Sequence, residues 1–259
     1  MNSNSISRAI YQTSERLLQQ NLSRTDIAII TWLSNAETLP DRMVGMTELY
    51  EVLDPHPNAL EAPYTFFLPD TEVIKAVCNG DHVKAIIRAV PPSRQYDAER
   101  MWIRVTSAQP NWLEGTLDSQ PLDMPQLLQG TILRLPRSHV IDVILADPER
   151  MPRTVKPKRE YWARCLVDQC VLDGELKVGY LYREKSDMTK EGDKFPDSGW
   201  RIRGDTRGSS IKELGSRKIA YVALGLVLNK DDTWLHVIDE PAGASFEKDF
   251  EKGIFVPEK

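Results

Sequence analysis

The chain has 259 residues, 41% of them hydrophobic, and a formal net charge of −5. This length and apolar content allow a sizeable core, in one large domain or two modest ones. The charge excludes a strongly basic protein. No basic stripe of the kind that neutralises a phosphate backbone is visible, so we expect no direct binding of nucleic acid.

The opening residues and the cysteines indicate where the protein resides. Residues 1–20 contain no short apolar block with a small-residue cleavage site, and no window reaches 18 consecutive apolar residues. We therefore expect a cytoplasmic protein without a membrane partner. The three cysteines, Cys78, Cys165 and Cys170, are too few for a disulfide framework and fit a reducing compartment.

Charge is distributed unevenly along the chain. Residues 1–150 contain 13 Lys+Arg and 19 Asp+Glu, whereas residues 151–259 contain 20 and 19. The acidic first part either attracts a basic protein partner or simply keeps the chain soluble.

The first 90 residues predict a small layer of helices and strands. Apolar residues at helical spacing indicate an amphipathic helix over residues 5–20. A later helix is expected to begin at an Asp70 cap and to end at Gly80. The other predicted elements are a helix over 44–53 and strands over 25–33, 64–68 and 82–90.

A β-rich unit is predicted next, over about residues 93–145. Its strand-like runs alternate apolar with polar residues and are interrupted by proline and glycine. Trp102 and Trp112 lie in these runs, either as cross-strand packing or as part of a binding surface. The runs cover residues 99–109, 112–120 and 131–145.

The main domain boundary is predicted between residues 150 and 151. Residues 146–160 contain three prolines and five basic residues without apolar periodicity, which is typical of a linker. We therefore expect an α+β protein of two domains. The amino-terminal α/β layer with its β-rich unit covers 1–150, and a carboxy-terminal α+β domain covers 151–259.

In the second domain, residues 161–184 predict two extended runs joined by a tight hairpin at Asp173-Gly174. Residues 218–229 are apolar enough for a buried helix or strand, and their length favours a helix. Residues 234–238 and 245–258 complete an α+β pattern.

No metal site, cofactor or nucleophile is predicted, because no convergent set of residues is visible. Cys165 and Cys170 would point to opposite faces of a strand, and neither has a histidine nearby in the sequence. There is no Gly-x-Ser-x-Gly motif, and residues 204–210 (GDTRGSS) lack the Gly-Lys-Ser/Thr step of a phosphate loop. The four histidines, which are scattered singly, are His56, His82, His139 and His236.

A metal-dependent nuclease is the most serious enzyme alternative. Pro196-Asp197 could open a Pro-Asp…Asp/Glu-x-Lys set, in which carboxylates hold the metal and lysine polarises the attacked phosphate. The second half of the set is missing, because Glu213 is followed by Leu214 and Gly215 without the lysine.

Residues 195–205 (FPDSGWRIRGD) concentrate acids, arginines and a tryptophan. A purely structural interpretation is a turn in which Asp197 and Ser198 bond their own backbone, Gly199 takes a positive φ and Trp200 is buried. The density of opposite charges suits either an internal lattice of salt bridges or a polar binding face.

Four separated blocks follow one another in the second domain: 178–184 (VGYLYRE), 197–201 (DSGWR), 204–205 (GD) and 241–247 (PAGASFE), with Phe255 near the end. Together they resemble a known bacterial family, the thirty-third immunity-protein family, earlier catalogued only as a domain of unknown function. The resemblance covers about residues 162–258. It departs from the family where an acidic stretch is replaced by residues 206–210 (TRGSS). Residues 99–143 loosely resemble a second small β-rich domain of unknown function.

The resemblance implies a cytoplasmic antidote that is made beside a toxic effector, binds that toxin and protects the producing cell and its kin. The appended amino-terminal domain is similar to that of immunity proteins of type VI secretion effectors, some of which are nuclease-like. We therefore predict a non-enzymatic inhibitor that acts by contact with its cognate toxin.

The candidate partner-binding residues are Arg183, Asp197, Trp200, Arg201 and Asp205, and no catalytic residue is assigned. Two alternatives stay open. One is a small hydrolase or modifying enzyme that uses the Asp197 and Asp205 carboxylates in a shared cleft. The other is a nucleic-acid-associated regulator, which would need a basic patch. No oligomeric state is predicted.

Overall fold

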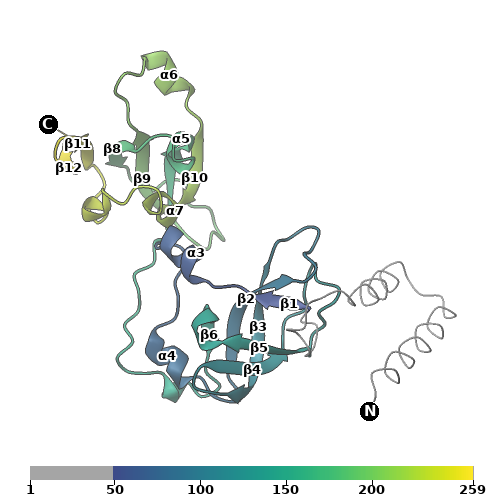
Figure 1. The fold of residues 1–259 in the computed structure, drawn as a ribbon. Helices are drawn as coiled ribbons and strands as arrows, with labels where there is room; N and C mark the ends of the chain where they lie inside the picture. Colours follow the sequence, from purple (N-terminus) through teal and green to yellow (C-terminus); the bar gives the residue numbers. More distant parts are fainter. Residues whose placement is uncertain (1–48, 259) are drawn as a thin grey trace, which may run out of the picture. The chain divides into compact units, whose positions relative to one another are not determined.

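The computed structural model describes residues 49–258 and places them in two six-stranded β-sheets with short helices between the strands (Figure 1). The fold is therefore a sheet-rich α+β fold. The predicted helix over 5–20 and strand over 25–33 lie outside the described residues.

The first sheet has the strand order β1-β2-β3-β4-β5, and β6 pairs with β2. All its pairs are antiparallel. It confirms the predicted strand over 82–90 and the predicted β-rich unit. The strands are β1 (Tyr50–Val52), β2 (His82–Ala89), β3 (Glu99–Ala108), β4 (Trp112–Leu117), β5 (Ile132–Pro136) and β6 (Asp142–Ile144).

Alternation of apolar and polar residues explains why these runs form strands. On β3, Met101, Ile103 and Val105 are buried while Arg100 and Arg104 are exposed. A strand turns successive side chains to opposite faces, so one face of the sheet becomes an apolar core. The buried residues of this core come mainly from β2 (Val83, Ala85, Ile87, Ala89), β3, β4 (Leu113, Leu117) and β5 (Leu133, Leu135).

The predicted helix over 44–53 is wrong over its described part. Tyr50 and Val52 pack against the first core while Glu51 is exposed, and Tyr50 pairs with Ala89 of β2. Apolar side chains at every second residue are typical of a strand, which here forms the edge of the sheet, and not of a helix.

The predicted strand over 64–68 is also wrong. The segment turns after helix α3 (His56–Glu61), where the Phe66 N–H donates to the Ala62 carbonyl at 2.8 Å. The Tyr64 N–H donates to the Asn229 side-chain oxygen at 2.9 Å. A side chain far along the chain thus satisfies a backbone group that a strand would have paired with a neighbouring strand.

Helix α4 (Thr71–Ala76) begins as predicted and ends early. The Asp70 carboxylate accepts the Glu72 N–H at 2.9 Å, which confirms the cap. The last helical residue is Ala76, four residues before Gly80, because Val77 is already extended. The Arg137 guanidinium donates hydrogen bonds to the Ile74 and Val77 carbonyls and so satisfies carbonyl groups at the end of this helix.

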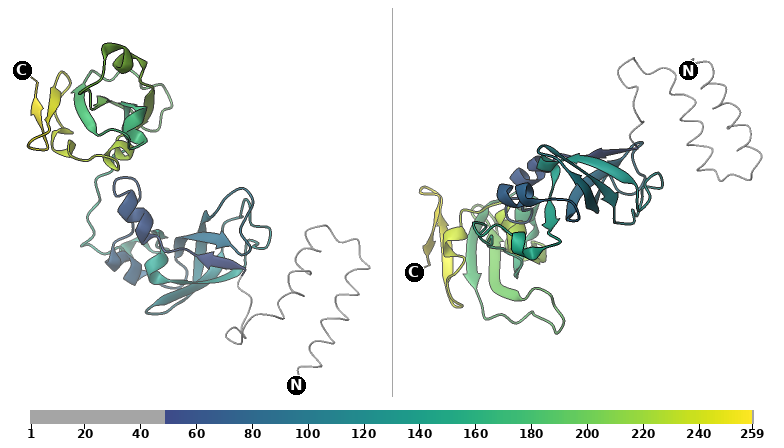
Figure 2. Two further views of the ribbon diagram at one scale, coloured as in Figure 1. Left: turned by 45° about the horizontal axis from the view of Figure 1, so that its top comes forward. Right: turned by 90° about the horizontal axis from the view of Figure 1, so that it is seen from below.

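The second sheet has the strand order β10-β7-β9-β8-β11-β12, with β7 and β9 parallel and the other pairs antiparallel. In Figure 2 the β11–β12 hairpin, coloured yellow, lies at the edge of this sheet. The strands are β7 (Arg164–Asp168), β8 (Val178–Arg183), β9 (Asp197–Gly204), β10 (Ile219–Ala223), β11 (Ser245–Asp249) and β12 (Ile254–Pro257).

One face of the second sheet packs against short helices around two tryptophans, Trp200 and Trp234, which are both fully buried. Their ring centroids are 6.0 Å apart in an edge-to-face arrangement. The helical segments of this half are α5 (Gln169–Leu172), α6 (Ile211–Ser216), α7 (Leu224–Leu228) and the 3-10 turn η4 (Leu235–Val237).

The predicted hairpin at Asp173-Gly174 is wrong, because β7 and β8 are not neighbours. Helix α5 follows β7 directly, and β9 lies between the two strands. The buried Asp168 carboxylate at the end of β7 accepts the Gly204 N–H of β9 at 3.0 Å. This long-range contact helps to hold β9 where a hairpin would have placed β8.

Residues 218–229 form strand β10 followed by helix α7, so the prediction of a helix is correct only for the second half. Ala220 and Val222 pack alternately against the second core, and β10 pairs with β7. The change to helix comes at Leu224, whose N–H donates to the Ala163 carbonyl.

The division into two domains stays a prediction. Two separate apolar clusters belong to the two sheets. Contacts nevertheless group residues from Leu49 onward into one unit.

Candidate functional site

A cavity of about 580 Å³ opens in the carboxy-terminal part, where β8 ends and β9 begins. Three of the four sequence blocks that carry the family resemblance contribute to its lining. They supply Arg183 and Glu184 from the first block, Asp197, Ser198 and Trp200 from the second, and Pro241 and Ala242 from the fourth.

Trp200 contributes the buried indole of this cavity. It faces the second core from β9, and its indole N–H donates to the Ile238 carbonyl at 3.1 Å. Leu224 and Ile238 add apolar surface. The aromatic ring is therefore fixed by packing and by one hydrogen bond, which confirms the prediction that Trp200 is buried.

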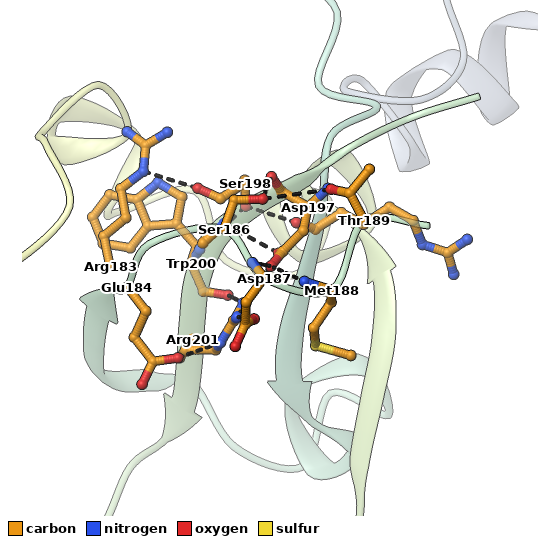
Figure 3. Close-up of polar contacts among 12 residues, drawn as sticks. Arg183, Glu184, Ser186, Asp187, Met188, Thr189, Asp197, Ser198, Trp200 and Arg201 are labelled. Carbon is orange, nitrogen blue, oxygen red and sulfur yellow. Dashed lines mark hydrogen bonds and ion pairs between the residues drawn. The ribbon is translucent and has the colours of Figure 1, made fainter. Parts of the chain in front are cut away.

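Arg183 is held beside this ring by backbone groups. Its Nε donates to the Ser198 carbonyl at 2.9 Å and its Nη1 to the Glu240 carbonyl at 2.7 Å. The guanidinium lies 5.6 Å from the centroid of the Trp200 ring. Figure 3 shows the Arg183 side chain running beside the indole and reaching toward Ser198. Within residues 49–258, no carboxylate forms an ion pair with Arg183.

Arg201, the neighbour of Trp200, points to the opposite face of β9 and is the centre of a charge cluster. Its guanidinium bonds both oxygens of Asp197, at 3.0 and 3.1 Å, together with Glu184 at 2.9 Å and Asp187 at 3.1 Å. The Arg201 and Asp197 side chains are 5% and 0% exposed, whereas Glu184 and Asp187 are 50% and 73% exposed. This is the internal lattice of salt bridges that the sequence left open, with two of its acids at the surface.

Asp197 also organises the loop between β8 and β9. Its carboxylate accepts the Gly199 N–H at 3.1 Å, and the Asp187 and Met188 N–H groups at 3.4 Å each. Thr189 Oγ1 accepts the Asp197 N–H at 2.9 Å. Figure 3 shows this loop folded back onto Asp197. The Asp197 carboxylate is therefore a structural centre and is satisfied by its own chain.

These contacts fix the ionisation of the pair. Burial would raise the pKa of Asp197, but the hydrogen bonds from Arg201 and Gly199 outweigh it and hold this pKa below the usual value. The hydrogen bond to Asp197 in turn raises the pKa of Arg201. Both groups are charged at neutral pH.

The lowered pKa of Asp197 predicts a stability that depends on pH. A carboxyl whose folded-state pKa lies below its unfolded value, about 4, stabilises the fold above that value and loses this contribution as the pH falls through the folded-state pKa. Urea unfolding of wild type at pH 7, 5, 4 and 3 should show falling stability, and Asp197→Asn should flatten the decline. The matched control is Glu251→Gln, because Glu251 is exposed. An unchanged slope in Asp197→Asn would contradict this assignment.

Asp205 lies away from the cavity, just beyond the opposite end of β9. Asp205 lies eight positions after Asp197, a distance of about 26 Å in an extended strand. The Arg207 side chain bonds both Asp205 oxygens and lowers the pKa of this carboxyl. The two aspartates therefore do not share a cleft, and neither is a protonated acid at neutral pH. The hydrolase alternative that relied on this pair loses its geometric basis.

Other reactive groups give no assembled centre in the described part. Burial raises the pKa of the Cys165 thiol to about 12, and burial also raises the pKa of Cys170. A thiol of this kind is a weak nucleophile. Among residues 49–258, no group of three His, Cys, Asp or Glu side chains is placed to hold a metal ion. No helix in the same range is long and apolar enough to span a membrane.

The structure thus brings four of the five predicted partner-binding residues together. Arg183, Asp197 and Trp200 line the cavity, and Arg201 bonds two of its acids, whereas Asp205 lies apart. Asp197, Trp200 and Arg201 are buried, so direct contact with a partner stays a prediction for them.

Sequence reasoning missed other residues that line the cavity. Arg159 bonds both oxygens of Asp239, at 2.7 and 2.5 Å, across 80 positions of sequence. Arg159 lies in the segment interpreted as a linker, and no sequence pattern connects it to Asp239. Lys185 directly follows the first block, and its adjacency was the one available signal.

The tryptophans of the first sheet lie on its outer face. Lys84 lies 4.2 Å from the Trp102 centroid and Arg134 lies 4.0 Å from the Trp112 centroid. Strand pairing thus brings cations from distant positions in the sequence onto one face. One cation covers each ring, which leaves less of the ring free for a partner. This supports the cross-strand packing interpretation, and a binding role for the two rings stays a prediction.

The carboxy-terminal part is similar to the class of immunity-protein domains. Residues 165–258 match the family model described as the immunity protein Imm33 domain. The match runs from β7 to β12, and it confirms the resemblance carried by the four blocks. No curated protein and no solved structure matches the chain.

Proposed function

We propose that this chain is an immunity protein that binds a cognate bacterial toxin and neutralises it by protein–protein contact, without catalysis. The single observation that carries the proposal is the Imm33 match over residues 165–258, which suggests a role in toxin immunity. The convergence of three family blocks on one cavity supports it, because a shared site explains why blocks far apart in sequence occur together.

The finer proposal is that the toxin is a type VI secretion effector with nuclease-like activity, and that the protein acts in the cytoplasm of the producing cell. The support is the arrangement of an appended amino-terminal part before the immunity domain, which is similar to that of type VI immunity proteins. TsiT is a candidate relative among them. A contact surface of about 800 Å² per partner would suffice for a stable complex.

Co-expression tests the proposal directly. The protein encoded by the neighbouring reading frame is expressed with and without this chain, and we expect growth arrest to be relieved and a complex to co-purify. If the chain neither restores growth nor binds that protein, the proposal is wrong.

Titration in vitro separates contact from catalysis. Toxin activity is measured against increasing amounts of the purified chain. A binding inhibitor reaches full neutralisation at a fixed molar ratio that does not change with incubation time. An enzyme would neutralise at far lower ratios and progressively with time, and that result would favour the modifying-enzyme alternative.

A further inference from the structure

We infer that the cavity beside Arg183 receives an acidic side chain of the neutralised toxin, with the Arg183 guanidinium as its anchor. The inference rests on the proposed function and names the chemistry of the contact. It depends on the charge balance of the residues that line the cavity.

Arg183 forms no ion pair within residues 49–258, although its charge, after the hydrogen bond from Arg159, also lowers the pKa of the nearby Asp239 carboxylate. Two of its five N–H groups donate to the carbonyls of Ser198 and Glu240. Three N–H groups are left, and no described carboxylate is paired with them. Lys185, at the exposed edge of the cavity, is the other lining cation that no carboxylate of the described part pairs with.

The acids of the cavity, in contrast, are already engaged. Asp197 and Glu184 bond Arg201, Asp239 bonds Arg159, and Glu160 accepts the Trp162 indole N–H at 2.6 Å. A further carboxylate entering the cavity would find donors on Arg183 and Lys185.

The fixed position of Arg183 makes it suitable as an anchor. Its two bonds to carbonyls and its contact with the Trp200 ring hold the guanidinium before a partner arrives. A fixed planar guanidinium binds a carboxylate with little further loss of side-chain entropy. Arginine beside buried aromatic residues is also the composition enriched at the energetic centres of protein interfaces.

The same surroundings disfavour a polyanion. Among the described lining residues only Arg183 and Lys185 are cations without a carboxylate partner, so the cavity offers donors for one carboxylate and not for a chain of phosphates. The exposed carboxylates of Glu160 and Glu184 would repel each further phosphate. The geometry therefore favours a toxin carboxylate over the backbone of a nucleic acid.

The experiment measures the affinity of the full-length chain for a catalytically inactive form of the neighbouring reading-frame product. Arg183→Lys keeps the charge and loses the planar fork, and we expect its Kd to rise at least about 30-fold. Lys185→Glu reverses a solvent-exposed charge, and we expect a rise of about fivefold to tenfold, mainly through slower association. The matched control is Lys190→Glu, an exposed lysine of the same loop that does not line the cavity. It should bind like wild type.

A reciprocal change identifies the toxin residue. Each surface Asp and Glu of the inactive toxin is replaced by lysine, and one of these variants should lose wild-type binding and regain affinity for the Lys185→Glu chain. Thermal unfolding of every variant accompanies the titrations. If Arg183→Lys is unstable because Ser198 and Glu240 lose donors, the Lys185→Glu and Lys190→Glu pair decides the matter.

The outcomes separate this inference from the proposed function. If wild type neither binds nor neutralises the toxin, the proposed function is wrong. If wild type binds and both cavity variants bind equally well, the function stands and the cavity contact is wrong. If Lys190→Glu weakens binding as much as Lys185→Glu, the effect is one of general charge and the inference is overturned.

Discussion

Replacing Arg201 by methionine is expected to lower the free energy of unfolding by about 3–5 kcal/mol, the cost of leaving one partner of a buried ion pair uncompensated. The side chains of Arg201 and Asp197 are 5% and 0% exposed, so water cannot replace the lost bonds to Asp197. Urea unfolding at pH 7 measures the change.

The control is Arg207→Met, because Arg207 is paired with Asp205 but 63% exposed. Surface pairs of this kind contribute at most about 1 kcal/mol. The double variant Asp197→Asn, Arg201→Met should be more stable than Arg201→Met alone, since no unpaired charge then stays buried. A loss below 1 kcal/mol in Arg201→Met would show that the cluster is not a stabilising centre.

Replacing Gly199 by alanine is expected to cost about 3 kcal/mol or more, for two reasons that add. Gly199 has a φ of +80°, which strains any other residue by about 1–3 kcal/mol. A Cβ there would also lie 2.1 Å from the Glu184 carbonyl oxygen. The backbone at the end of β8, which carries Glu184, would therefore have to move. Chemical unfolding of the purified variant measures the loss.

Two other glycines separate the two causes. Gly192 has a φ of +89° with nothing within 4 Å of an added Cβ, so Gly192→Ala should show the conformational cost alone, about 1–3 kcal/mol. Gly215, in α6, has neither a positive φ nor a close neighbour, and Gly215→Ala should cause no loss. If Gly199→Ala and Gly192→Ala lose the same amount of stability, the close approach to the Glu184 carbonyl does not contribute to the loss.

The strands of the first sheet could be predicted because their signal is local. Met101, Ile103 and Val105 alternate with polar residues, and that alternation alone assigns them to the buried face. The Asp70 cap, the positive φ of Gly199 and the burial of Trp200 are also properties of a few neighbouring residues, and all three predictions are confirmed.

The second sheet could not be predicted as well, because its arrangement depends on contacts between distant residues. The Asp173-Gly174 dipeptide is typical of a hairpin, yet β7 pairs with β9 and β10. Residues 218–229 are apolar except at their two ends, and only pairing with β7 makes the first half a strand. Local pattern gives the type of a residue's surroundings but not the identity of its neighbours.

For a similar reason, only part of the candidate site could be predicted. Arg183 and Trp200 lie in blocks recognisable by resemblance, and the pairing of β8 with β9 makes them direct neighbours. Asp205 belongs to the same run of charges as Asp197, but a strand carries it to the other end of the sheet. Arg159 and Asp239 meet across the fold without any pattern that links them.

The position of β9 between two earlier strands has a consequence for synthesis. β7 and β8 emerge from the ribosome first, but neither is the other's neighbour, and the strand that joins them is complete only at Gly204. Closure of the second sheet must therefore wait for distant segments, which slows folding relative to a chain of local hairpins. A nascent chain interrupted before that point would still lack Leu224, Ile238 and Pro241, which complete the lining of the cavity.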